Sequence, residues 1–166
     1  TMAVSKLVVV HGGELAKDVA EQIVAKKPAT SSISDVSLQP ASQRPKALLG
    51  LKDDTLVCFV MQTIENAAPA EEGGSCLRFF KRKTHPESLL EDNKFSFCVL
   101  GVGDSNLLLD RQTTTAQDCN QVAQQLDSRL EALSGKRFYK LGLADERTGL
   151  QEVEPWINGL WTALEK

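Results

Sequence analysis

The chain lacks a long hydrophobic run, an excess of positive charge and closely spaced cysteines, and each absence excludes a class of protein. No apolar run approaches the roughly 20 residues that a membrane-spanning helix needs, and no basic region followed by an apolar one opens the chain. We therefore expect no membrane insertion and a cytoplasmic location. The net charge of -3 lacks the basic surface that a general nucleic-acid binder requires, so no nucleic-acid partner is predicted.

The four cysteines exclude a second group of functions. No two of them have the close spacing of a zinc or redox motif, so we predict no metal site. Cys58 and Cys98 lie inside apolar runs, where a free thiol behaves as a small hydrophobe, and reduced thiols suit a cytosolic protein. The one basic run, residues 81–83, is interpreted as a solvated helix end.

Aromatic residues are scarce, at 5% of the chain, and the common catalytic signatures are missing. Ser105 lacks the Gly-x-Ser-x-Gly context of a nucleophile elbow, and the glycine run at 101–103 lacks the third glycine of a dinucleotide fingerprint. His11 and Glu14 would lie opposite Asp104 in a parallel sheet. A histidine at a strand end and an acid in a first helical turn need no catalysis, however, so we predict no catalytic residue.

What the chain does have is an alternation of strand-like and helix-like segments. Apolar runs at 56–61 and 95–100 predict strands buried on both faces, and 33–38 alternates as a half-buried strand should. The remaining strands are expected at 7–10 and 138–143. Apolar residues at helical spacing predict helices over 16–23, 77–83, 122–133 and 153–164, whereas the run at 71–74 is interpreted as a loop.

Five strands alternating with helices predict one α/β domain over residues 1–166. The expected architecture has three layers, a five-stranded parallel sheet in the order 2-1-3-4-5 with helices on both faces. Ligands of such sheets bind outside the carboxyl ends of the strands, at the point where the strand order reverses. Residues 11–15, 62–74 and 101–115 would meet at that point.

Three stretches of the chain carry a family resemblance. They read LGVGDSN at 100–106, GLADERTGL at 142–150 and VEPWINGLW at 153–161. Together they resemble the FMN-binding, flavodoxin-like domain of diflavin reductases. The resemblance implies a flavodoxin-like fold, FMN as cofactor and an ancestry in electron transfer. It also implies that the chain is the N-terminal part of a larger protein that continues into an FAD and NADPH domain.

The resemblance also assigns the cofactor site, in a form that departs from the family pattern. In the family, hydroxyl side chains and a glycine wrap the FMN phosphate at a helix N-terminus. The matching residues here contain no hydroxyl, and an acidic side chain among them would repel a phosphate dianion. These residues are His11, Gly12, Gly13 and Glu14.

The second and third loops show similar losses. Gln62 and Thr63 match the second loop, without its close-approach glycines, and Leu107 stands where the family places an aromatic on the flavin ring. Losing two or three hydrogen bonds to the phosphate, together with ring stacking, costs at least about 4 kcal/mol, or a thousandfold in affinity. Backbone N–H groups could restore part of this. The other matching residues of the third loop are Gly101, Gly103, Asp104 and Asn106.

The sequence leaves two functions open. One is a protein-interaction or scaffolding module with weak or no FMN binding. The other is a working FMN domain that passes electrons from an NADPH/FAD reductase module to an acceptor protein. The resemblance places partner docking at Asp145 and Glu146, so the expected partners are another protein or the downstream FAD/NADPH domain.

Overall fold

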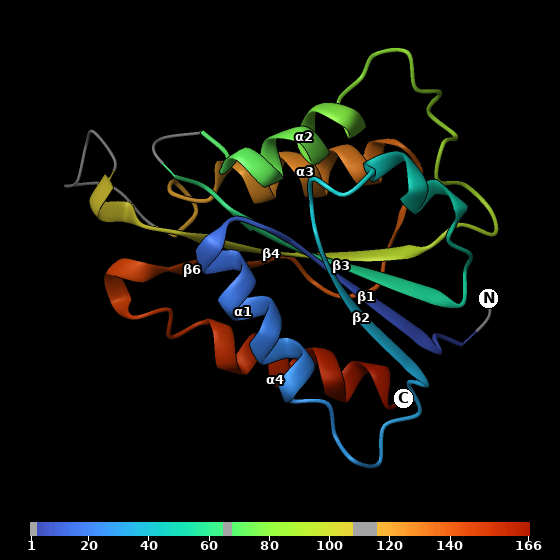
Figure 1. Ribbon diagram of the computed structural model, residues 1–166, viewed down its shortest axis with the longest axis horizontal. Helices are drawn as coiled ribbons and strands as arrows, with labels where there is room; N and C mark the ends of the chain where they lie inside the picture. Colours follow the sequence, from blue (N-terminus) through green and yellow to red (C-terminus); the bar gives the residue numbers. More distant parts are fainter. Residues whose placement is uncertain (1–2, 65–67, 108–115) are drawn as a thin grey trace.

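The computed structural model describes residues 3–64, 68–107 and 116–166 and is built around a parallel β-sheet (Figure 1). The adjacent strands in this sheet all run parallel to one another. The predicted order 2-1-3-4-5 is confirmed. The strands run in the order β2 (Asp35–Pro40), β1 (Lys6–Gly12), β3 (Thr55–Gln62), β4 (Ser96–Gly103) and β5 (Lys136–Arg137), and β6 (Gly142–Asp145) also pairs with β4.

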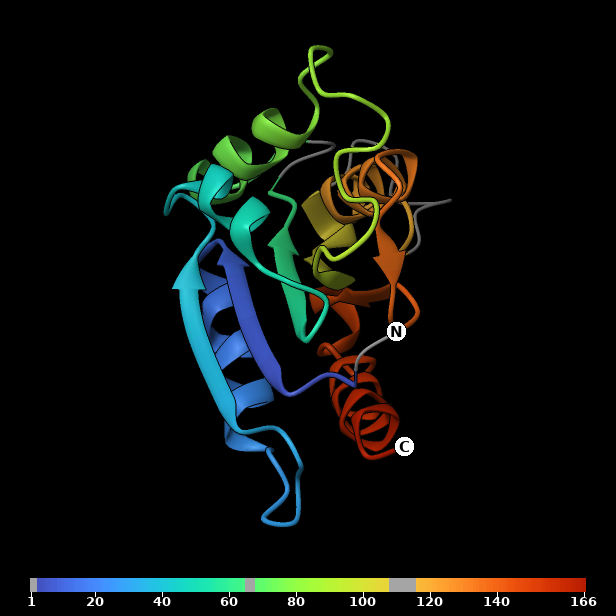
Figure 2. The ribbon, with the colours of Figure 1, turned by 90° about the vertical axis from the view of Figure 1, so that its right-hand side faces the viewer.

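Two pairs of helices cover the two faces of the sheet, which confirms the three layers (Figures 1 and 2). One face carries α1 (Glu14–Ala25) and α4 (Val153–Leu164). The other face carries α2 (Glu71–Phe80) and α3 (Gln121–Ala132). Within the described parts of the chain, no helix is long and apolar enough to cross a bilayer. Short 3-10 turns are η1 (Pro45–Gly50), η2 (Ser105–Leu107) and η3 (Glu146–Thr148).

The central strands supply both cores because their side chains alternate between the two faces. In β3, Cys58 and Val60 belong to the core under α1 and α4, whereas Phe59 and Met61 belong to the core under α2 and α3. The edge strand β2 begins two residues later than predicted and contains no buried residue. Leu38, which the alternation places on the face toward the core, is 38% exposed. The predicted apolar stripe of α1 is buried throughout.

All four cysteines are free and buried. Cys58 and Cys98 are register partners on β3 and β4, and burial raises the pKa of the Cys98 thiol well above its ordinary value. Burial likewise raises the pKa of Cys76 and of Cys119 to about 12. The thiols of Cys76, Cys98 and Cys119 therefore stay protonated at neutral pH. Cys58 and Cys98 are buried in the core as small hydrophobes, as the sequence predicts.

The predicted strand at 138–143 is wrong in its extent, because β5 ends at Arg137 and β6 begins at Gly142. The indole Nε1 of Trp156 in α4 donates a hydrogen bond to the Lys140 carbonyl at 2.9 Å, so this carbonyl has a partner outside the sheet. Gly142 leaves room for the indole, since an added Cβ would lie 2.5 Å from the Trp156 ring. The apolar pattern of a segment does not show whether a helix from a distant part of the chain packs against it.

Residues 71–74 form the first turn of α2, and the prediction of a loop there is wrong. Glycine costs a helix about 1 kcal/mol relative to alanine, so a Gly73-Gly74 pair indicates a loop by propensity alone. Both glycines are buried. An added Cβ on Gly12 would lie 2.8 Å from the Gly73 Cα, so the helix rests directly on the end of β1. This close packing offsets the poor helix propensity.

We predict that Gly142→Ala lowers the free energy of unfolding by about 1 to 3 kcal/mol, because the new methyl group overpacks the contact with Trp156 and Leu100. Gly50→Ala is the matched control, since an added Cβ there meets nothing within 4 Å. Its effect should stay within about 0.5 kcal/mol. Urea unfolding of both variants checks the prediction, and equal effects would contradict this account of the split strand.

Candidate functional site

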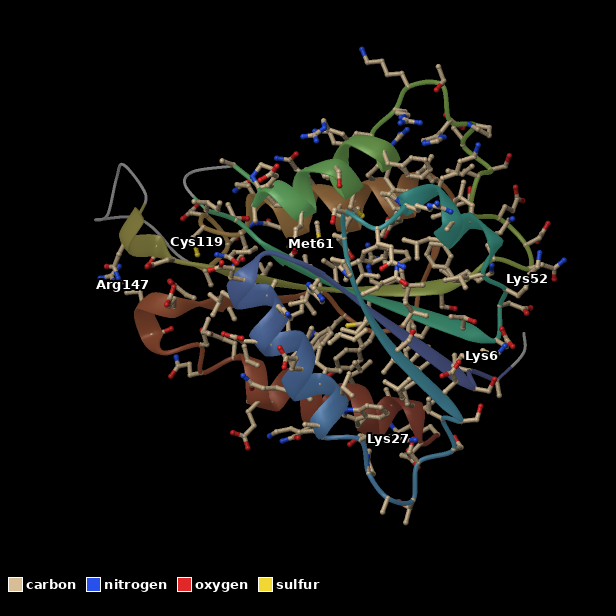
Figure 3. The ribbon with its side chains drawn as sticks, viewed as in Figure 1. Lys6, Lys27, Lys52, Met61, Cys119 and Arg147 are labelled. Carbon is tan, nitrogen blue, oxygen red and sulfur yellow. The ribbon has the colours of Figure 1, made fainter. Side chains whose placement is uncertain are left out.

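The structure brings the described parts of the three predicted loops together at the carboxyl edge of the sheet. β1 and β3 are adjacent, with Gly12 opposite Met61, and β3 and β4 are adjacent, with Gln62 opposite Val102. Figure 3 places Cys119 and Arg147 at this edge and Lys6 and Lys52 at the opposite one. The residues matched to the three family loops therefore lie on neighbouring strand ends.

The N-terminus of α1 is occupied by side chains of this chain. The first N–H groups of a helix have no partner within the helix and attract acceptors, anions above all. Here the Leu15 N–H donates to Gln62 Oε1 at 3.0 Å, and the Gly13 N–H donates to Glu72 Oε2 at 3.4 Å. Gly13 has a φ of 132°, and an added Cβ would collide with the Gln62 side chain. Gln62 and Glu72 thus act as a self-cap, the name used below for this pair.

His11 lies beside the self-cap. Its side chain is buried, and Nδ1 lies 3.7 Å from Glu72 Oε2. That nitrogen makes no hydrogen bond within the parts of the chain that the structure describes. The Glu72 side chain is 43% exposed, so its carboxylate can still reach water. Glu14 is exposed in the first turn of α1, where it adds a second negative charge.

Sequence reasoning missed the role of Glu72, because it interpreted residues 71–74 as a loop and placed the segment 62–74 at this edge without assigning a contact to Glu72. The close approach of Gly73 to Gly12 brings the start of α2 against the start of α1. Gly12 and Gly73 together therefore set the position of the Glu72 carboxylate. A small residue at the end of one strand and another in the next helix is the sequence signal that could have indicated this contact.

Thr63 and the glycines of β4 hold the start of α3. Thr63 is buried, and its Oγ1 accepts a hydrogen bond from the Val122 N–H at 3.1 Å. An added Cβ on Gly101 would lie 2.6 Å from Ala123 Cβ, and one on Gly103 would collide with the Cys119 carbonyl. These three residues, matched to cofactor loops, serve here to pack α3 against the sheet.

Asn120 is a second residue that sequence reasoning missed. It occupies the N-cap position of α3, but its side chain does not cap the helix. Its Nδ2 donates instead to the Ala116 carbonyl at 2.8 Å and the Ala144 carbonyl at 2.9 Å, which ties α3 to β6. An asparagine before a helical stripe is a common N-cap signal, yet here Thr63 accepts from the helix instead.

The third loop is described only up to residue 107. Asp104 Oδ1 accepts from the Asn106 N–H at 2.9 Å at the start of η2, and Asn106 is exposed. The Leu107 backbone belongs to η2. Its side chain lies outside the described residues, as do residues 108–115, so the absence of a flavin-stacking platform stays a prediction.

The two predicted docking residues have different environments. Asp145 is buried, with its Oδ1 accepting from the Ser105 N–H at 2.9 Å and the Arg147 N–H at 3.0 Å. Burial opposes the charge, but these hydrogen bonds outweigh it, so the pKa of Asp145 lies below its ordinary value. Glu146 is exposed. A docking role for this loop therefore rests on Glu146, while Asp145 ties η2 to η3.

The family described as Flavodoxin matches residues 11–156. The chain is 36% identical over 152 residues to methionine synthase reductase of Bos taurus, covering 91% of this chain and 20% of that protein. It is 26% identical over 168 residues to NADPH-dependent diflavin oxidoreductase 1 of Bos taurus, covering 96% of this chain and 25% of that protein. The chain spans about a fifth to a quarter of the length of these relatives.

We predict that Asp145→Asn lowers the free energy of unfolding at neutral pH by about 1 to 3 kcal/mol, because two N–H groups lose a charged acceptor. The folded-state pKa is depressed, so this stabilisation is complete above the unfolded-state pKa of about 3.9 and is lost as the pH falls through the folded-state value. Denaturant unfolding over a range of pH should show that the difference in free energy of unfolding between the variant and the wild type becomes smaller in acid. Glu146→Gln, the exposed neighbour, should change little, and a difference constant with pH would contradict the role of the carboxylate.

Proposed function

Because the chain belongs to the flavodoxin family and its relatives are diflavin reductases, we propose that it is a diflavin-reductase-type domain with a degenerate FMN site. In this proposal it serves as a protein-interaction or scaffolding module, with weak or no FMN binding. The observation that supports the proposal is the self-cap. Gln62 and Glu72 already accept from the backbone N–H groups at the start of α1.

The self-cap would oppose a phosphate for two reasons. A phosphate dianion must displace acceptors from Gly13 and Leu15, and each hydrogen bond to a charged group is worth about 1.5 to 3 kcal/mol. The carboxylates of Glu72 and Glu14 add like-charge repulsion at the same helix end. If FMN cannot form these two hydrogen bonds through its phosphate, its affinity for the chain falls by about a hundredfold or more. The residues described at this edge therefore do not fit the FMN phosphate.

Other features support a role in binding proteins. By buried hydrogen bonds, Asp145 ties η2 to η3 and Asn120 ties the start of α3 to β6. Glu146 is exposed on the turn that Asp145 stabilises. A turn that is held by such hydrogen bonds presents a surface to a partner at low entropic cost. A domain that has kept the fold but not the phosphate site would act through such surfaces.

The alternative is a working FMN domain that passes electrons from an NADPH/FAD module to an acceptor protein. When bound, FMN would supply the electron transfer. The observation that favours this alternative is the long hydrogen bond of 3.4 Å between Gly13 and Glu72, together with the 43% exposure of the Glu72 side chain. Such a carboxylate can move into the solvent and leave the Gly13 N–H free to bind a phosphate.

A titration of the purified chain with FMN separates the two functions. We expect no saturable binding at high micromolar FMN, measured by quenching of flavin fluorescence and by calorimetry, since the self-cap competes for the helix end. Saturable binding at micromolar or tighter affinity would overturn the proposal and favour the electron-transfer alternative.

We further predict that Glu72→Gln strengthens FMN binding by about tenfold or more, because it removes one negative charge from the helix end. Glu71→Gln is the matched control, since Glu71 belongs to the same helical turn but is exposed. Calorimetric titration of both variants checks the prediction. An equal gain in both would indicate a general charge effect and would contradict the self-cap as the cause of exclusion.

A further inference from the structure

A basic groove lies between η1 and α2, apart from the carboxyl-edge site. It encloses about 530 Å³. Three cationic side chains line it, Arg44, Lys46 and Arg82, and no carboxylate is among its described lining residues. Its apolar lining comes from Pro45, Ala47 and Phe79.

The charge of this groove contrasts with that of the whole chain. The chain carries a net charge of -3, yet the groove combines three positive side chains. All three residues are exposed, and none forms an ion pair within the described residues. Cations gathered along an apolar surface focus the local potential and attract negative ligands.

The end of α2 holds Arg82 in place. Its guanidinium lies 5.0 Å from the centre of the Phe79 ring, a cation–π contact. Arg129 of α3 donates to the Phe80 carbonyl at 2.7 Å and to the Arg82 carbonyl at 3.0 Å. His85 Nε2 lies 2.7 Å from the Phe79 carbonyl. The backbone that carries Arg82 is therefore fixed before any ligand arrives.

The opposite wall of the groove is unusual in its backbone. Arg44 has a φ of 35°, in the left-handed region that residues other than glycine seldom adopt. Such conformations cluster at binding and catalytic sites, where the surrounding structure holds them. The helix dipole accounts for cations at the end of α2, but not for Arg44 and Lys46, which approach from another segment. The run at 81–83 is exposed at the end of α2, as the sequence predicts, and Arg82 of that run also lines the groove.

We propose that this groove binds an acidic segment of a partner protein. Carboxylates along the segment would face Arg44, Lys46 and Arg82, and an apolar side chain would rest on Pro45 and Phe79. Charge complementarity favours an acidic ligand, and the apolar lining between separated cations suits an amphipathic peptide better than a lone phosphate. The inference rests on the proposed function, because it names the surface through which an interaction module would bind.

The test uses a fluorescein-labelled peptide of glutamates with one central phenylalanine. Fluorescence polarisation should show saturable binding to the purified chain that weakens as salt is raised. The double variant Lys46→Glu/Arg82→Glu should lose affinity by about tenfold or more. The matched control is Lys27→Glu/Lys52→Glu, which makes the same change in net charge at exposed lysines outside the groove, both labelled in Figure 3. The control should keep near wild-type affinity.

Three outcomes of the peptide titrations would overturn the inference. They are no peptide binding by the wild-type chain, an equal loss in both double variants, or equal binding of a peptide without the phenylalanine. Preference for anionic phosphatidylserine vesicles over the peptide would overturn it too, and would indicate a lipid surface instead. Urea unfolding of both variants confirms that they are folded. The FMN titration is a separate readout, so tight FMN binding would defeat the proposed function without deciding the peptide result.

Discussion

The first backbone N–H groups of α1 need hydrogen-bond acceptors, and the packing of the carboxyl edge of the sheet depends on how they are supplied. In this chain the acceptors come from Gln62 and Glu72. Glu72 can reach the helix only because α2 rests on the end of β1, where Gly12 and Gly73 allow the two backbones to touch. A helix N-terminus at such a position typically binds an anion, but here side chains of the same chain occupy it.

The same edge shows how residues of a ligand-binding loop can take on packing. Thr63 accepts from the start of α3, and Gly101 and Gly103 allow that segment to approach β4 closely. Asp145 uses its charge to tie two turns together rather than to face solvent. Each contact gives a family-like residue a structural reason to be present, so its identity alone is weak support for cofactor binding.

Charge is arranged along α2 in keeping with its dipole. Glu71 and Glu72 begin the helix, and Arg78 lies in its last turn. The start of the helix therefore contributes an anion to the α1 terminus, and Arg82, just past its other end, contributes a cation to the groove beside η1. A single helix thus links the feature that opposes FMN to the surface that we propose for a partner.

The sequence by itself determined the strands, the faces of the helices and the sheet order, because hydrophobic periodicity is local and each period of two or 3.6 residues selects an element. It also indicated which loops meet, since strand order fixes which carboxyl ends are neighbours. Only the tertiary structure decided that residues 71–74 are helical, that the fifth strand breaks at Lys140, that Asp145 is buried and that Glu72 caps α1. Those features depend on contacts between segments far apart in the chain. Gly13 and Glu72, for example, are separated by 59 positions, and no local pattern records such a pairing.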